Sequence, residues 1–313
     1  MKKFNMRLLI CIAVLFISAQ THAYWWNSSY TKTKYPIVLV HGLLGFDQAF
    51  GVYDYFFRIP AELEDGGAIV FVADVSAANS SELRGEQLLE QLQTIKALYG
   101  HDKFNLIGHS HGAPTARYVA SVRPDLVASV TSVGGPHKGS AVADTLQSVL
   151  VPGSTLEALA ETFITGIAVF VEIISGGAGD PQDVIASMVS LSTAGSAAFN
   201  ASYPEAIPLS ACGQGQYVVN GVSYFSFGGT GVITNLLDPS DIVLAAGSVF
   251  FWGEANDGLV GRCSSHLGKV IRDNYPWNHG DEINQVLGLR GLFASNPISV
   301  YRAHANRLKN QGL

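Results

Sequence analysis

The sequence of 313 residues is poor in cysteine and in charge, and it has no basic cluster. Neither Cys212 nor Cys263 has a Cys-x-x-Cys partner or a nearby pair of histidines, which disfavours a thiolate metal site. Charged residues make up 14% of the chain and the net charge is −6, which argues against nucleic acid binding but permits a cation site. Internal repeats and an inter-domain linker are also lacking. We therefore expect one large domain.

Hydrophobic runs long enough to cross a bilayer are scarce as well. The chain begins Met-Lys-Lys, runs apolar over residues 8–17 and reaches Thr-His-Ala at residue 23. A basic start, a short apolar run and a small-residue cleavage site are typical of a secretory signal peptide, so we assign residues 1–23 to one. The mature chain would then be residues 24–313, and it would be exported. In an oxidising compartment its two cysteines, Cys212 and Cys263, are expected to pair, the alternative being two buried free thiols.

What is abundant is a set of continuous apolar runs, typical of strands buried on both faces. Such runs occupy residues 35–40, 68–73, 104–107 and 127–133, and helical patterns follow the second at 79–99 and the third at 113–122. Asn79, with Glu82 three residues later, is the predicted cap of the first helix. This alternation predicts an α/β fold with a mostly parallel central sheet and helices on both faces. An Asn-Gly pair at 220–221 predicts a hairpin.

Residues 108–112 read Gly-His-Ser-His-Gly and join the third strand to the next helix. Glycine at the two outer positions permits a turn too tight for side chains, which would present Ser110 as a nucleophile. An ordinary glycine-rich turn gives the same five letters. The preceding strand and the following helix favour the catalytic interpretation, because active sites of open α/β sheets lie at the carboxyl ends of strands.

A serine nucleophile needs a histidine base and an acid. In α/β folds with such a serine turn, the acid follows the serine in the sequence and the histidine follows the acid. Asp257 follows a strand-like run at 248–252, and His279 lies in a loop ahead of a helical run that starts at Glu282. His266, near Cys263, and His304, in an amphipathic terminal helix, are the rival bases. The oxyanion would be held by the backbone N–H groups of His111 and of Leu43 in the His-Gly-Leu-Leu-Gly stretch at 41–45.

An apolar helical segment at 156–174 lies within an insertion of roughly 142–200. Three glutamates argue against a membrane span. Two interpretations stay open: a buried core helix, or an amphipathic lid that opens against lipid.

The chain resembles the Pseudomonas-type, foldase-dependent secreted triacylglycerol lipases of bacteria. The matching motifs cover essentially all of the mature chain, namely residues 33–39, 41–47, 108–112, 136–140, 210–213, 256–260, 263–268 and 301–310. The resemblance implies an α/β-hydrolase fold with a helical lid insertion and the triad Ser110, Asp257 and His279. It also implies partners, namely a lipase-specific foldase and an outer-membrane secretion machinery, and a protein secreted through the periplasm.

The same resemblance implies one structural calcium ion, held by Asp238, Asp281, Gln285 and the carbonyl of Leu289. Two carboxylates with amide and backbone oxygens suit this hard cation. Read without the family, Asp281 and Gln285 are only a pair four residues apart near a helix start, where Asp281 would serve as a cap.

We therefore expect a triacylglycerol lipase that cleaves acylglycerol esters at lipid–water interfaces through an acyl-enzyme. An esterase or acyltransferase acting on soluble short-chain esters would use the same triad and is the alternative. A lipid-binding module without catalysis is the remaining class.

Overall fold

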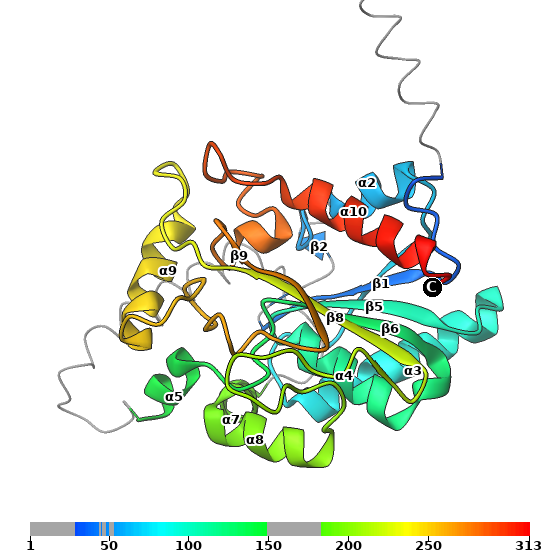
Figure 1. Ribbon diagram of the computed structural model, residues 1–313, viewed down its shortest axis with the longest axis horizontal. Helices are drawn as coiled ribbons and strands as arrows, with labels where there is room; N and C mark the ends of the chain where they lie inside the picture. Colours follow the sequence, from blue (N-terminus) through cyan, green and yellow to red (C-terminus); the bar gives the residue numbers. More distant parts are fainter. Residues whose placement is uncertain (1–28, 44, 46–47, 50–52, 149–182) are drawn as a thin grey trace, which may run out of the picture.

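The computed structural model describes residues 29–43, 45, 48–49, 53–148 and 183–313 (Figure 1). Its strands are β1 (Ile37–Val40), β2 (Gln48–Ala49), β3 (Tyr53–Asp54), β4 (Val70–Ala73), β5 (Phe104–His109), β6 (Val127–Val133), β7 (Val218–Val219), β8 (Val222–Gly229) and β9 (Lys269–Tyr275). Its α-helices are α2 (Ile59–Asp65), α3 (Ser81–Tyr99), α4 (Gly112–Val122), α5 (Ala141–Ser148), α7 (Val184–Leu191), α8 (Thr193–Ser202), α9 (Ser240–Ser248) and α10 (Pro297–Asn310). Short 3-10 helices are η1 (Pro124–Leu126), η2 (Val249–Phe251) and η3 (Asp281–Ile283).

The central sheet of the described residues has seven strands in the order β4-β1-β5-β6-β8-β7, with β9 also paired to β8. All these pairings are parallel except that of β7 with β8, which form a hairpin. Asn220 and Gly221 turn this hairpin at φ values of 53° and 79°, as the Asn-Gly signature predicts. The predicted parallel sheet is therefore confirmed.

Helices cover both faces of the sheet, with α2 and α10 on one side and α3 and α4 on the other (Figure 1). The alternation along β1 separates the two core clusters. Ile37 and Leu39 pack toward α2 and α10, whereas Val38 and Val40 pack toward α3 and α4. All four side chains are buried, which explains why the strand reads as a continuous apolar run.

Three connections leave the same edge of the sheet, because they follow the carboxyl ends of the parallel strands β1, β5 and β9. They carry residues 41–43, Ser110 and His279, respectively. Chemistry-bearing residues far apart in the sequence are thus gathered at one edge.

Three local predictions were wrong. The run at 248–252 is not a strand: it is the end of α9 followed by η2, and Trp252 ends it in the left-handed region. The helical run from Glu282 is only the short η3, which ends at Asn284 with a φ of 64°. The N-cap of α3 is Ser80, whose hydroxyl accepts from the Leu83 N–H, and not Asn79.

The signal peptide and the apolar segment at 156–174 lie outside the described residues, as does most of the insertion at 142–200. The described part of the insertion forms α7, α8 and nearly all of α5. Within the described ranges, no single helix is long and apolar enough to cross a membrane. The pair α7 and α8 passes that test only when taken together, and it is bent by 77° at its junction.

Candidate active site

Ser110 stands on a sharp turn between β5 and α4. Its φ is 54°, its N–H donates to the carbonyl of Val133 at 2.9 Å, and its own carbonyl accepts from the N–H of Ala113 at 3.0 Å. A Cβ on Gly108 would overlap the backbone of Gly112, and a Cβ on Gly112 would overlap the carbonyl oxygen of Val40. Both outer positions therefore require glycine for the space they have, as the motif predicted.

His279 and Asp257 are in direct contact. The Nδ1–H of His279 donates to Oδ2 of Asp257 at 2.7 Å, and the backbone N–H of His279 donates to the carbonyl of Asp257 at 2.9 Å. The other carboxylate oxygen accepts from the N–H groups of Leu259 and Val260 at 2.9 and 2.7 Å. Because Nδ1 carries the proton, Nε2 of His279 is the basic nitrogen. This buried Nε2 has no hydrogen-bond partner among the described residues.

The two rival histidines have structural contacts instead. His266 lies between the carbonyl of Gly213, at 2.8 Å from Nδ1, and Asp273, at 3.0 Å from Nε2. His304 lies on the buried face of α10, where its Nε2 is 2.7 Å from the hydroxyl of Thr131. Of the three histidines after Asp257, only His279 contacts that acid.

His109, the residue before Ser110, ties the nucleophile turn to the base. Its ring lies 4.5 Å from the ring of His279, and its Nε2 is 3.1 Å from the carbonyl oxygen of His279. Its Nδ1 is 2.7 Å from the hydroxyl of Tyr55. Ser110 and His279 are thus neighbours through His109, although 169 positions separate them in the sequence.

The two predicted oxyanion donors lie at the ends of elements that flank Ser110. His111 is the residue before α4, and Leu43 follows β1. Neither N–H donates to another residue of the described ranges. The loop before Leu43 is held by Arg84 of α3, whose buried guanidinium donates to the carbonyls of His41, at 2.6 Å, and Gly42, at 3.3 Å. Burial lowers the pKa of Arg84 to about 9.

A second carboxylate, Glu282, lies buried beside the base. Its Oε1 accepts from the N–H of Gly229 at 2.6 Å, and its Oε2 is 3.3 Å from Nε2 of His109 and 3.8 Å from Nδ1 of His279. Burial and the charge of Asp257 raise the pKa of Glu282. One ligand atom each from His109, His279 and Glu282 lie within 4.8 Å of one another, so this cluster has the composition of a metal site.

A different acidic cluster surrounds the residues predicted to bind calcium. Asp238 and Asp281 are buried near each other, and the Oδ1 of Asp281 has no hydrogen-bond partner among the described residues. Burial, aided by the charges of Asp238 and Asp241, raises the pKa of Asp281 to about 7. Asp241 is fully engaged, since it accepts from the N–H groups of Thr234 and Asn235 and from the Asn278 amide.

Gln285 and the disulfide were also predicted. The side-chain amide of Gln285 donates to the carbonyls of Asp54 and Tyr55, at 2.8 and 2.9 Å, so its nitrogen is bound to β3 and the residue after it. Cys212 and Cys263 form a disulfide, which confirms the predicted pairing.

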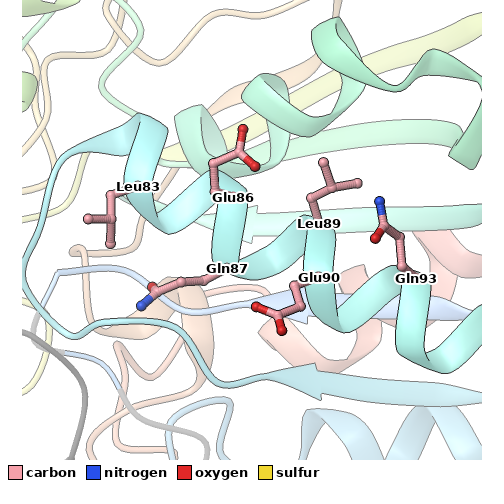
Figure 2. Close-up of a pocket in the computed structure, with 6 residues that line it drawn as sticks. All are labelled: Leu83, Glu86, Gln87, Leu89, Glu90 and Gln93. Atoms are coloured by element: carbon pink, nitrogen blue, oxygen red, sulfur yellow. The ribbon is translucent and has the colours of Figure 1, made fainter.

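A shallow cavity of about 370 Å³ lies along one face of α3 (Figure 2). It is lined by Leu83, Glu86, Gln87, Leu89, Glu90 and Gln93. It contains no serine, cysteine or histidine, and none of its six residues belongs to the group around Ser110. It is therefore not the candidate active site.

Sequence reasoning missed four polar residues of the site: Tyr55, Arg84, Asp241 and Glu282. Each is buried, and their contacts are largely with residues distant in the chain. The only sequence signal available was a polar side chain within an otherwise apolar stretch.

Comparison with known proteins agrees with the observed fold. A family profile for the alpha/beta hydrolase fold matches residues 35–283. The mature lipase BlEst2 of Bacillus licheniformis has a similar structure, with a TM-score of 0.61 at 19% identity, over 88% of this chain and 93% of that one. A lipase of Staphylococcus hyicus gives a TM-score of 0.56 at 19% identity, over 90% and 97% of the two chains. The protein is an α/β hydrolase.

Closer relatives are found by sequence, and each is named triacylglycerol lipase. One from Vibrio cholerae is 57% identical over 287 residues, covering 92% of this chain and 91% of the relative. Another, from Pseudomonas fragi, is 46% identical and covers 90% and 98%, and one from Burkholderia plantarii is 41% identical and covers 91% and 88%. The chain belongs to this family of bacterial triacylglycerol lipases, and it is a carboxylic ester hydrolase.

Proposed function

We propose that the protein hydrolyses triacylglycerols through a triad of Ser110, His279 and Asp257. The observation that carries this proposal is the contact of 2.7 Å between His279 Nδ1 and Asp257 Oδ2, next to a serine at positive φ. A serine on a sharp turn, an imidazole and a buried carboxylate together form the combination that activates a hydroxyl for acyl transfer.

In the first half-reaction, Nε2 of His279 takes the Ser110 proton while Oγ attacks the ester carbonyl carbon. Asp257 holds the ring and stabilises the imidazolium. The N–H groups of Leu43 and His111 bind the oxyanion. The C–O bond to the alcohol then breaks, and His279 protonates the leaving oxygen. In the second half-reaction His279 takes a proton from water, whose oxygen attacks the acyl-enzyme, and Ser110 regains its proton as the fatty acid leaves.

The proposed substrate class is supported by the relatives of 41–57% identity described above, which are named triacylglycerol lipase. We propose action at lipid–water interfaces, with residues 142–200 as the lid insertion of a single domain spanning 24–313. We further propose cleavage of a signal peptide at 1–23, assistance by a lipase-specific foldase and secretion across the outer membrane. These follow from the leader-like start of the chain and from the resemblance to foldase-dependent lipases.

A calcium ion fits the acidic cluster. Two buried carboxylates, Asp238 and Asp281, repel each other, and an unpaired Oδ1 on Asp281 offers a hard oxygen ligand. We propose Gln285 and the carbonyl of Leu289 as the further oxygen ligands; the side-chain nitrogen of Gln285 donates to the carbonyls of Asp54 and Tyr55, and a nitrogen held in this way fixes the position of the amide. The bound ion would supply structural support, because it would fix the loop that carries His279 two residues before Asp281.

The catalytic proposal is tested with Ser110→Ala and an ester series from short to long acyl chains. We expect the variant to lose at least about 10⁴-fold in turnover on every ester. Unchanged turnover would refute the nucleophile assignment. For the wild type, a rate on a long-chain triglyceride that rises sharply once the substrate forms an emulsion supports the lipase, whereas activity confined to dissolved short-chain esters supports the alternative esterase.

The calcium proposal is tested by chelation. We expect EDTA to lower the melting temperature of the wild type and to leave that of Asp281→Asn, already lowered, nearly unchanged. Equal melting temperatures of the wild type with and without EDTA would contradict the assignment.

A further inference from the structure

A single path of hydrogen bonds runs beneath the candidate active site. The N–H of Gly42 donates to the hydroxyl oxygen of Tyr55 at 3.0 Å, and this hydroxyl lies 2.7 Å from Nδ1 of His109. On the far side of the same ring, Nε2 of His109 is 3.1 Å from the carbonyl oxygen of His279 and 3.3 Å from Oε2 of Glu282. Every side chain on the path is buried.

The chemistry of the partners gives the path a direction. Because the carbonyl oxygen of His279 can only accept, Nε2 of His109 carries the ring proton and donates it there. Nδ1 of the neutral ring carries no proton, so it accepts from the Tyr55 hydroxyl, whose oxygen in turn accepts from the Gly42 N–H. Burial lowers the pKa of His109 and raises that of Tyr55, so both groups keep the neutral forms that this direction requires.

The path ends at two parts of the catalytic machinery. Gly42 precedes Leu43, whose N–H is one assigned oxyanion donor, and His109 precedes Ser110. The other end is the main chain of His279 itself. We propose that Tyr55 and His109 are positioning residues, which hold the oxyanion donor of Leu43 and the base His279 at fixed positions relative to Ser110. This inference rests on the proposed triad and adds two residues that act through it.

A buried chain of hydrogen bonds can stabilise a fold without any part in catalysis. The test therefore needs a measured quantity that a change in stability alone would leave the same. Charge develops on the oxyanion and on His279 only in the transition state. Misplacing these groups therefore lowers kcat, while KM changes little.

Tyr55→Phe removes one oxygen and keeps the ring. On a soluble short-chain ester, with calcium present, we expect kcat to fall about 10- to 100-fold and KM to stay within about threefold. Tyr224→Phe is the matched control. Its hydroxyl is also buried but has no hydrogen-bond partner among the described residues, and it lies on β8, outside the path. We expect it to keep the wild-type kcat.

A second variant tests whether the two residues form one path. His109→Gln removes the ring that joins the two ends. If the residues act in series, the double variant Tyr55→Phe/His109→Gln loses hardly more than the worse single variant. Multiplying losses would mean independent effects and would overturn the path. Rates are divided by the folded fraction, measured by circular dichroism, so a partly unfolded variant still yields a kcat.

The outcomes separate the two proposals. Wild-type kcat in Tyr55→Phe, with activity abolished in Ser110→Ala, refutes the positioning role and leaves the triad intact. Equal losses in Tyr55→Phe and Tyr224→Phe would refute it as well, because a general softening of the core would explain both. Retained activity in Ser110→Ala refutes the proposed function itself.

Discussion

His304 is expected to make the free energy of unfolding depend on pH in the acidic range. The side chain lies on the buried face of α10, where its Nδ1 accepts from the Arg307 guanidinium at 3.0 Å and its Nε2–H donates to the Thr131 hydroxyl at 2.7 Å. A second proton on the ring would sit on Nδ1 and would face the positively charged guanidinium of Arg307. Burial first, and Arg307 second, lower the pKa of His304 to about 3.

The direction of the effect follows from linkage. An unfolded histidine titrates near its ordinary pKa of about 6.5. Between pH 6.5 and 3, His304 therefore binds a proton in the unfolded chain but not in the folded chain. Stability is therefore complete above about pH 6.5 and is lost as the pH falls through that window. At pH 5 the deficit is about 1.5 pKa units, or about 2 kcal/mol for this one residue.

The measurement is the free energy of unfolding in urea for the wild type and His304→Gln at pH 7, 6 and 5, with calcium held constant. The variant is less stable at pH 7, because it loses packing and hydrogen bonds, but the gap narrows by about 2 kcal/mol at pH 5. Other buried histidines remain in both proteins and cancel in the difference. A gap that does not change with pH would refute the reasoning.

Three further substitutions test the frame of the site. Gly112→Ala forces a Cβ onto the Val40 carbonyl, so we expect at least about a 100-fold loss of ester hydrolysis, and wild-type turnover would contradict the elbow geometry. Arg84→Lys gives up part of the contacts that the guanidinium makes with the carbonyls of His41 and Gly42, and we expect kcat to fall about tenfold in the same assay. Cys212→Ser opens a loop of 51 residues, which should cost about 4 kcal/mol in urea unfolding, as reduction of the wild type also should.

Buried strands and the serine turn could be predicted because their signals are local. The apolar run at 35–40 contains β1, and Gly108 and Gly112 mark a turn whose backbone leaves no room for a Cβ. Each of these features depends on a few neighbouring residues, so a short stretch of sequence carries it.

The run at 248–252 failed for the opposite reason. Phe250 and Phe251 pack into a small core with Val142 of α5, and such a short apolar run has the same composition in a buried strand or at the end of a helix. Only the packing of α5 against α9 and η2, absent from the local pattern, decides between them. Asp257 was placed correctly on a loop although the element before it was misassigned.

The supporting network could not be predicted. The network joins residues up to 170 positions apart in the sequence, namely Gly42, Tyr55, His109 and His279. No spacing in the sequence predicts these contacts. A buried tyrosine or histidine reads the same whether its polar atoms are used in a network or not. The proposed triad could be predicted from the sequence because the fold constrains its order along the chain, whereas the residues that support it are recognisable only in three dimensions.

The left-handed backbone of Ser110 has a consequence for protein engineering. A non-glycine residue at a φ of 54° costs about 1–2 kcal/mol, and glycine at the same place would avoid that cost. The substitution that relaxes the chain most directly is therefore one that removes the hydroxyl. A screen for heat resistance alone would favour variants at Ser110 that are more stable and inert, so any search for a hardier form of this protein needs turnover as a simultaneous criterion.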